Sequence, residues 1–399
     1  MILGHKIRIY PDKEQTLALT KAVGVARFTY NWALNEWKLW YEHDQKPNGL
    51  KLKKYFNKIK GKKYPWIYDS LRDANSQEFS NLQKAFKNFF EGRSKYPVFK
   101  KKGKNDSFYI SNDKFRIKDR KVKLPKMGWI KMAEELRFEG KIQSATVSRT
   151  SNYWFISFNV DIPDYKKDRI SDNEIGIDLG LKNFITCSDG FKTEPNNELK
   201  KELKKLRRVS RRHSRKKLGS NNRKKSQIKL SKLHYRILNK RRDVIHKLTS
   251  KICRENQTIV IEDLNVKGMV KNRKLARSLS DASFGEFRRQ LEYKSQIYSC
   301  SLIKAPRFFP SSKQCSNCGC LKEDLKLSDR VYSCEHCGFE IDRDLNASIN
   351  LKHLIDKSTL GFRGINASGH TGSGRWPQAV DETGMVEGRI ILDQIYEYV

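Results

Sequence analysis

Two pairs of cysteines stand late in the sequence at the spacing of metal ligands. Cys315 and Cys318 form one C-x-x-C pair, Cys334 and Cys337 form the other, and 15 residues separate the pairs. Each pair runs on into a glycine, which allows a tight turn with backbone amides directed at sulfur. Four thiolates at such a spacing are typical of a zinc ribbon, whose tetrahedral site is closed to further ligands. The pattern therefore predicts one structural zinc ion and leaves two nearby candidates outside the site, Cys320 and His336.

Carboxylates follow three segments that have the pattern of core elements. Asp178 ends a strand-like stretch, Glu262 follows the apolar run 258–261, and Asp342 and Asp344 open a segment of helical periodicity. An uncompensated charge in a protein core is costly, so each buried acid needs a partner. A lysine or arginine is the ordinary partner of a single acid. Three acids at the ends of core elements fit shared Mg²⁺ better, because this ion takes oxygen ligands.

Such a cluster can hold two Mg²⁺ ions about 3.5–4 Å apart, which activate water and stabilise the leaving oxygen of a phosphodiester. The acids occur in the order Asp178, Glu262 and a later aspartate. This order is similar to that of ribonuclease-H-like nucleases of the RuvC type. Transposases of the DDE type have their acids in a different order, in which the glutamate comes last. The residues alone leave open whether Asp342 or Asp344 is the third acid.

The net charge indicates the class of partner. The chain has 82 Lys and Arg against 45 Asp and Glu, a formal charge of +37, and self-repulsion of this size usually implies a polyanionic partner. Nucleic acid is the first candidate and a membrane surface the second. No apolar run approaches the roughly 20 residues of a spanning helix, and the N-terminal residues lack the pattern of a signal peptide. We therefore expect a cytoplasmic protein without a membrane partner.

Basic residues are densest in residues 200–247, where periodic leucines on either side of Gly219 predict two helices. A basic run is often only a solvated face, but the length and density of this one favour a surface that follows nucleic-acid phosphates. A second candidate is the polar face of a helix expected at roughly 73–91. The candidate phosphate contacts on these two segments are Lys84, Lys87, Arg211, Arg212 and Arg215.

The periodicity of the sequence divides the chain into three parts. Residues 1–10 alternate as a strand, and residues 12–45 and 73–91 have helical periodicity. Residues 105–162 switch to a period of two, which predicts a small antiparallel barrel or sandwich that includes the first strand. The helices are then an insertion after that strand. A third unit is expected from about residue 172.

These motifs together are similar to the TnpB family, the RNA-guided nucleases of small insertion sequences and relatives of compact type V CRISPR effectors. The resemblance covers most of the chain. It rests on stretches in a fixed order that include IRIYPDKEQ, ARFTYNWAL, LQKAFKNFFEGRSKYPVFKKKG, GIDLGLKNF, IVIEDLNVKGM, SDASFGEFRRQLEYK, FFPSSKQCSNCGC and CGFEIDRDLNASINL.

The resemblance implies a multidomain α+β fold. A wedge-type β-barrel with an inserted helical recognition domain precedes a RuvC nuclease domain of the ribonuclease-H-like α/β type, which a zinc-ribbon module for target loading interrupts. The corresponding ranges are 1–11 and 103–170 for the wedge, 12–102 for the recognition domain, 171–305 and 340–358 for RuvC, 306–339 for the zinc ribbon and 359–399 for a flexible C-terminal tail.

The resemblance also implies a function. The protein would use a structured guide RNA from the transposon end, recognise a short target-adjacent motif and cut both strands of DNA at one site that holds two Mg²⁺ ions. Carried over by motif, the catalytic and magnesium-binding residues are Asp178 in GIDLG, Glu262 in IVIED and Asp344 in DRDLNA. The segment before AFKNFF reads the adjacent motif in the family, which makes candidates of Arg72, Ser76 and Gln77.

Two other functions compete with this one. Nuclease-inactive RNA-guided DNA-binding regulators resemble the chain but lack acidic positions, and all three acids are present here. A DNA-joining transposase is disfavoured by the order of the acids.

Overall fold

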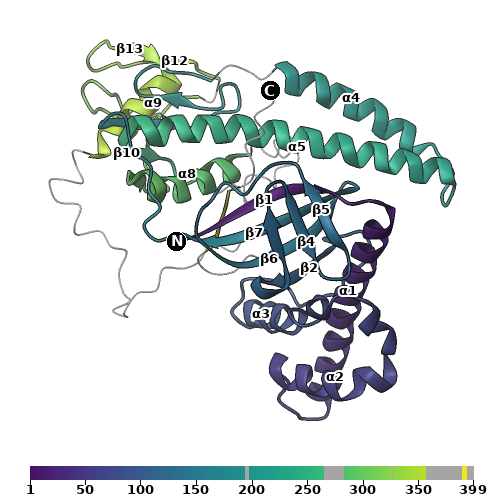
Figure 1. Cartoon of the computed structure of the whole chain (residues 1–399). Helices are drawn as coiled ribbons and strands as arrows, with labels where there is room; N and C mark the ends of the chain where they lie inside the picture. The colour runs from purple at the N-terminus through teal and green to yellow at the C-terminus, as the bar shows by residue number, and fades with distance from the viewer. Residues whose placement is uncertain (194–196, 265–282, 327, 356–388, 393–399) are drawn as a thin grey trace. The chain divides into compact units, whose positions relative to one another are not determined.

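The computed structural model describes residues 1–193, 197–264, 283–326, 328–355 and 389–392 (Figure 1). The chain divides into two compact units. The first contains the residues up to Asp164 together with the strand at 389–392, and the second begins at Tyr165. None of the helices in these described ranges is long and apolar enough to cross a membrane.

The first unit is built on an eight-stranded sheet in the order β2-β6-β7-β1-β5-β4-β3, with β14 paired to β1. Its neighbouring strands are antiparallel except for β1 and β14. A tight turn joins β3 and β4, with Asp119 at a φ of 50°. The strands are β1 (Ile2–Tyr10), β2 (Ser107–Ser111), β3 (Arg116–Lys118), β4 (Lys121–Leu124), β5 (Gly128–Met132), β6 (Lys141–Thr150), β7 (Tyr153–Asp161) and β14 (Arg389–Leu392).

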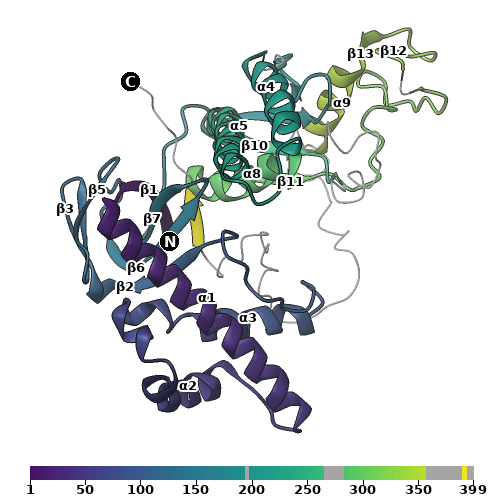
Figure 2. The ribbon, with the colours of Figure 1, turned by 90° about the vertical axis from the view of Figure 1, so that its right-hand side faces the viewer.

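Helices are inserted between β1 and β2, as the sequence predicts, but there are three rather than the two expected, because α2 was not predicted; Figure 2 shows the longest, α1, end to end. They are α1 (Lys13–Glu42), α2 (Gly49–Lys63) and α3 (Glu78–Phe90). The side chain of Asp12 accepts a hydrogen bond from the amide of Gln15 at 2.8 Å and starts α1. Trp37 of α1 stacks on Phe86 of α3 with 4.2 Å between ring centroids. One hydrophobic core runs from these helices into the sheet.

The helix expected at 73–91 is shorter than predicted. Residues Arg72–Ala74 form a 3₁₀ turn instead, and α3 begins at Glu78. The reason is a contact that the sequence pattern does not reveal, because the carboxylate of Asp73 accepts the backbone amide of Ser111 in β2 at 3.0 Å. This hydrogen bond holds the 3₁₀ turn against the sheet, so the turn is not continuous with α3.

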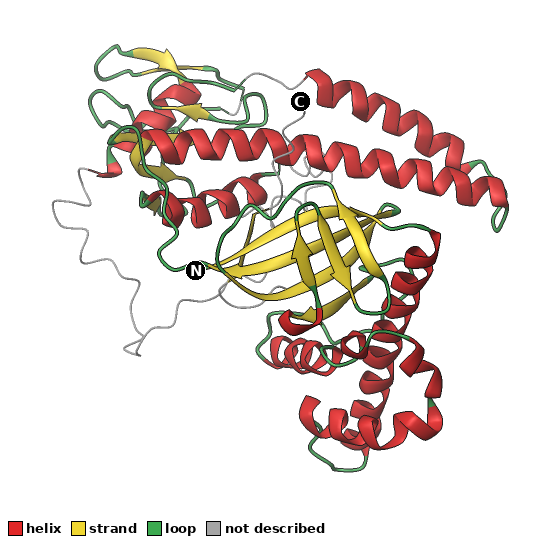
Figure 3. Cartoon of the chain, in the orientation of Figure 1, coloured by secondary structure: helices red, strands yellow, loops and turns green. Residues whose placement is uncertain are grey.

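The second unit contains a four-stranded sheet in the order β11-β10-β8-β9 (Figure 3). β8, β10 and β11 are parallel, and β9 returns antiparallel to β8. The apolar run predicted to be a doubly covered strand is β10, in the centre of the sheet, and its Ile259, Val260 and Ile261 are fully buried. The strands are β8 (Asn173–Asp178), β9 (Thr186–Cys187), β10 (Asn256–Ile261) and β11 (Ser301–Lys304).

Three helices of the second unit, α4, α5 and α9, are those that the sequence predicts, and α8 is one that it did not predict. The basic segment forms α4 (Asn197–Ser214) and α5 (Asn221–Glu255), which pack together and are separated at Gly219, whose φ is +79°. Figures 1 and 2 show α4 lying alongside α5. Two shorter helices follow, α8 (Phe284–Tyr298) and α9 (Arg343–Lys352). Of the segment expected to be a flexible tail, residues 359–399, only the four residues of β14 are described.

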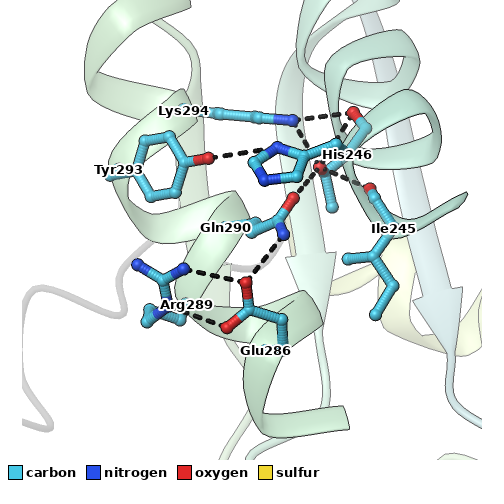
Figure 4. Close-up of polar contacts among 8 residues, drawn as sticks. Ile245, His246, Glu286, Arg289, Gln290, Tyr293 and Lys294 are labelled. Atoms are coloured by element: carbon cyan, nitrogen blue, oxygen red, sulfur yellow. Dashed lines mark hydrogen bonds and ion pairs between the residues drawn. The ribbon is translucent and has the colours of Figure 1, made fainter. Parts of the chain in front are cut away.

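A buried polar cluster joins α5 to α8 (Figure 4). The ammonium of Lys294 donates to the carbonyl of His246 at 2.7 Å, the hydroxyl of Thr249 at 2.7 Å and the hydroxyl of Ser250 at 2.8 Å. Thr249 also donates to the side-chain oxygen of Gln290 at 3.0 Å. Burial lowers the pKa of Lys294 to about 7. This cluster fixes the end of α5 immediately before it leads into β10.

Candidate active site and metal centre

The first two candidate carboxylates lie at the ends of neighbouring parallel strands. Ile177 of β8 pairs with Ile261 of β10, so Asp178 and Glu262 leave their strands at the same edge of the sheet. This carboxyl edge is where ligands bind in open α/β sheets. The sequence prediction that both acids follow core strands is confirmed.

Helix α9 brings the third carboxylate to this edge. α9 packs on β8, and Asp344 lies in its first turn. The approach is possible because Gly176 has no side chain: a Cβ added there would lie 2.5 Å from the backbone nitrogen of Lys352 and closer still to the carbonyl oxygen of Ser348. Glycine at position 176 therefore lets the backbone of α9 come close to β8.

The charges of Glu262 and Asp344 act on Asp178. Burial raises the pKa of Asp178 well above its usual value, and the charges of Glu262 and Asp344 raise it further. The nearby charge of Arg343 acts in the opposite direction. Burial also raises the pKa of Glu262, against a hydrogen bond from Ser311 that lowers it. Acids that oppose each other's ionisation at one strand edge are the electrostatic pattern of a functional site and are relieved by a cation.

The spacing of the acids bears on the number of ions they could hold. Within the described ranges, the sets of three or more ligand atoms lying within 4.8 Å of one another consist of cysteines and a histidine, so the three carboxylates do not form one tight cluster. Ligands of two ions about 3.5–4 Å apart span more space than the ligands of one ion. An all-carboxylate donor set suits Mg²⁺, which also keeps water and substrate oxygens in its shell.

The structure gives Asp342 and Asp344 different surroundings. Asp342 is the N-cap of α9, and its Oδ1 accepts the amides of Asp344 at 3.1 Å and Leu345 at 3.0 Å. Its other oxygen pairs with Lys192 at 2.9 Å. Burial would raise the pKa of Asp342, but the Lys192 and amide hydrogen bonds outweigh it and hold this pKa below its usual value. The helix and Lys192 thus engage Asp342, whereas Asp344 contributes to the potential at Asp178.

The four predicted zinc ligands come together. The Sγ atoms of Cys315, Cys318, Cys334 and Cys337 lie within 4.8 Å of one another, with 3.8 Å between Cys315 and Cys337 and 3.6 Å between Cys318 and Cys334. Both pairs turn at glycines, where φ is +79° at 319 and +67° at 338. A hydrogen bond from the amide of Phe339 lowers the pKa of Cys337 to about 6, which favours the thiolate that a metal needs.

The donor set therefore fits Zn²⁺, and short strands support it. β12 (Val331–Ser333) and β13 (Glu340–Asp342) pair around the second knuckle, and the fully buried Tyr332 packs between the cysteines. Cys318 also lies close to the two residues that the sequence pattern leaves outside the site, Cys320 and His336. The other three cysteines are buried in the core: Cys187, Cys253 and Cys300.

The candidate nucleic-acid contacts lie in both units. Arg72 is exposed in the 3₁₀ turn, and Ser76 and Gln77 are half-buried just before α3. Along α3, Lys84 is half-buried and Lys87 exposed. The other three are exposed at the end of α4 and just beyond it: Arg211, Arg212 and Arg215.

Sequence reasoning missed several residues that support the site. Asp263, directly after Glu262, forms ion pairs with Arg288 at 2.6 Å and Arg307 at 3.3 Å. Ser311 donates to Glu262 at 2.5 Å. These contacts join segments far apart in the chain, and the signal in the sequence is that Asp263, Arg288 and Ser311 lie in the IVIEDLNVKGM, SDASFGEFRRQLEYK and FFPSSKQCSNCGC stretches.

Three family models match the chain. A model described as a probable transposase, OrfB_IS605, matches residues 157–273, which include Asp178 and Glu262. A model described as the TNB domain of Cas12f1-like proteins matches residues 284–351, which include the four cysteines and Asp344. A model described as a helix-turn-helix domain matches residues 1–46, which here form β1 and the single long helix α1.

Curated relatives match over most of their length. A Streptomyces pristinaespiralis protein named as an RNA-guided DNA endonuclease is 35% identical over 356 residues, 87% of this chain and 88% of its own length. The chain belongs to the TnpB family. A second relative, InsQ of Escherichia coli K12, also named as an RNA-guided DNA endonuclease, is 31% identical and covers 87% of this chain and 91% of its own length. The family also includes a TnpB-like protein of Acanthamoeba polyphaga mimivirus, L770, at 27% identity over 88% of this chain and 72% of its own length.

Solved structures are more distant. A Cas12f1 complex with its guide RNA and target DNA is 19% identical, with a TM-score of 0.36 over 88% of this chain and 99% of that one. A CasPhi-2 complex with crRNA is 10% identical, with a TM-score of 0.47 over 89% and 98% of the two chains.

Proposed function

We propose that this protein is an RNA-guided DNA endonuclease of an insertion sequence that hydrolyses phosphodiester bonds at one RuvC-type site. The observation that carries the proposal is the placement of the three acids: Asp178 and Glu262 lie at the carboxyl edge of a parallel sheet, and Asp344 lies in the first turn of a helix that packs on β8, where its charge raises the pKa of Asp178. The names of the Streptomyces and Escherichia relatives support the same activity.

Asp178, Glu262 and Asp344 would hold two Mg²⁺ ions. Bound there, the ions supply a water of lowered pKa and positive charge at the leaving oxygen. The chain itself contributes the placement of the acids: β8 and β10 fix Asp178 and Glu262, and the close packing of α9 against Gly176 fixes Asp344. Asp342 is engaged by its ion pair with Lys192 and by the hydrogen bonds that it accepts from two amides at the start of α9, which favours Asp344 as the ligand.

The partners we propose are a structured guide RNA from the transposon end and double-stranded target DNA beside a short adjacent motif, met in the cytoplasm of a bacterium or archaeon. The formal charge of +37 and the exposed arginines of the α4 region support a phosphate-binding role. We keep the wedge, recognition, RuvC and zinc-ribbon ranges as domain proposals. The wedge and recognition segments share one hydrophobic core.

The test compares two substitutions that are two residues apart. The protein is purified with its copurifying RNA, the RNA is sequenced to define the guide, and cleavage of a matching DNA duplex is followed in Mg²⁺. Asp344→Asn should abolish cleavage. Asp342→Asn keeps the N-cap acceptor and should keep cleavage, and the lost ion pair with Lys192 should cost at most about 1 kcal/mol of stability. Cleavage that survives Asp344→Asn would overturn the assignment of the site.

The same preparation separates the alternatives. Site-directed breaks that require the RNA support the endonuclease, whereas joined products from element ends would support the transposase named by the family model. Guide-dependent DNA binding without any break would support the nuclease-inactive regulator.

A further inference from the structure

We propose that Ser311 is a positioning residue for Glu262, and that two asparagines of α9, Asn346 and Asn350, hold Ser311 in place. The inference rests on the proposed function, because it gives Glu262 the role of a metal ligand. It assigns a task to residues that lie between the zinc knuckle and the candidate active site and that belong to neither ligand set.

Ser311 makes a direct contact with the candidate ligand. Its side chain is only 4% exposed, and its hydroxyl donates to Oε1 of Glu262 at 2.5 Å. A hydroxyl fixes the orientation of a carboxylate without neutralising its charge, so the other oxygen remains available to a cation. Glu262 forms no ion pair with any residue that the structure describes, and burial is the main influence on its pKa.

The next residue has the opposite surroundings. Asp263 is held by two arginines, Arg288 at 2.6 Å and Arg307 at 3.3 Å. An acid paired in this way has its charge satisfied within the protein, which leaves it little to offer a metal. Of the two adjacent acids at the end of β10, the one with a neutral hydrogen-bond donor is therefore the one prepared for a cation.

Ser311 is itself anchored by α9. Asn350 is 3% exposed, and its Nδ2 donates to the carbonyl of Ser311 at 2.8 Å and to the carbonyl of Gln314 at 2.6 Å. Asn346 is fully buried, donates to the same Gln314 carbonyl at 2.7 Å and accepts the amide of Ser316 at 2.9 Å. The two asparagines are four residues apart and so share a face of the helix.

This arrangement links the two candidate metal centres. The anchored segment 311–316 includes Cys315, the first zinc ligand, and the helix that anchors it begins beside Asp344. Buried amides left without partners would be costly, so the segment and the helix keep a fixed relative position. The placement of Glu262 thus depends on the same helix that carries Asp344.

The experiment measures cleavage by the protein–RNA complex as a function of Mg²⁺ concentration. Ser311→Ala should raise the half-saturating Mg²⁺ concentration by about 10-fold or more, as expected for the loss of a residue that orients a metal ligand. Asn350→Ala should raise it in the same direction. Ser311→Thr keeps the hydroxyl and should therefore have a half-saturating Mg²⁺ concentration close to that of the wild type. Ser312→Ala is the matched control, because the hydroxyl of Ser312 makes no hydrogen bond with the described residues, and should match the wild type.

A second readout does not depend on DNA cleavage. Fe²⁺ added with ascorbate and peroxide cuts the polypeptide near a bound metal, and the cuts are mapped by mass spectrometry. Cuts near Asp178, Glu262 and Asp344 should appear in the wild type at lower Fe²⁺ concentration than in Ser311→Ala, with zinc content and guide-RNA binding unchanged.

The outcomes distinguish the inference from the function on which it rests. If Asp344→Asn abolishes cleavage but Ser311→Ala leaves both metal titrations unchanged, Ser311 has no positioning role and the proposed function stands. If Ser311→Ala weakens metal binding while Asn350→Ala does not, the anchoring by α9 is wrong. If Ser311→Ala and Ser311→Thr lose zinc and stability equally, the serine is structural only, which also overturns the inference.

Discussion

The close packing of α9 on β8 makes Gly176→Ala a demanding test of the candidate site. An added Cβ would lie 2.5 Å from the nitrogen of Lys352, whereas ordinary contact begins at 3.4 Å, and it would lie closer still to the carbonyl oxygen of Ser348. Both atoms belong to the backbone of α9, so no flexible side chain can move aside. The helix has to shift by about 1 Å, and the carboxylate in its first turn moves with it.

The size of the effect follows from this shift. Overpacking of a core typically costs about 1–3 kcal/mol, and a backbone clash belongs at the upper end. For a unit of roughly 200 residues, 3 kcal/mol lowers the melting temperature by about 6–12 °C. A misplacement of about 1 Å at an active site can reduce the rate about 100-fold. We therefore expect Gly176→Ala to lose both stability and DNA cleavage while the zinc content is kept.

The assay combines thermal unfolding with single-turnover cleavage by the protein–RNA complex. Gly285→Ala is the matched control, because a Cβ at Gly285 in the first turn of α8 would meet nothing within 4 Å. It should be neutral or stabilising by up to about 1 kcal/mol. If Gly176→Ala melts and cuts like the wild type, α9 does not pack on β8 in this way and Asp344 is not fixed beside Asp178.

Three further predictions concern charge and metal. The pKa of Asp178 is raised in the folded chain, so the folded state binds more protons than the unfolded state above pH 4 or so and stability falls as the pH rises; Asp178→Asn should therefore raise the melting temperature measured at pH 8 without added Mg²⁺, and an unchanged or lower value would refute the repulsion. Burial lowers the pKa of Lys294 to about 7 against an ordinary value of 10.5. Between these two pH values the unfolded state binds more protons, so the free energy of unfolding rises with pH. Urea unfolding at pH 7 and pH 9 should show this rise, and Lys294→Met should reduce it. Cys334→Ser should lower the zinc content measured by mass spectrometry and expose residues 311–342 to proteolysis, because metal binding and folding are coupled in small zinc modules; full zinc content in this variant would point to the neighbouring Cys320 and His336 as ligands.

Much of the site could be predicted from the sequence because its parts are local patterns. The apolar run before Glu262, the alternation before Asp178 and the spacing of the cysteines each lie within a short stretch of chain. Such patterns report which face of an element is buried and which side chain follows it. The close approach at Gly176 was predictable for the same reason, since only a residue without a side chain fits there.

What the sequence could not predict depends on contacts between distant segments. Helix α2 buries few apolar residues, among them Leu52 and Phe56, so its periodicity is masked by lysines. The choice between Asp342 and Asp344 depends on Lys192, 150 residues earlier in the chain. The bond between Ser311 and Glu262 spans 49 residues. Pairings of this kind are set by tertiary packing, which a local pattern does not record.

The order of the elements has a consequence for synthesis of the chain. α9 emerges from the ribosome 82 residues after β10 ends, and the whole zinc ribbon is made in between. At about 5–20 residues per second, this delay is roughly 4–16 s. A nascent chain that already exposes the basic helices α4 and α5 would thus lack the third acid until the ribbon has been made. Under the proposed function, a truncated translation product would bind nucleic acid through these helices but would be unable to nick DNA.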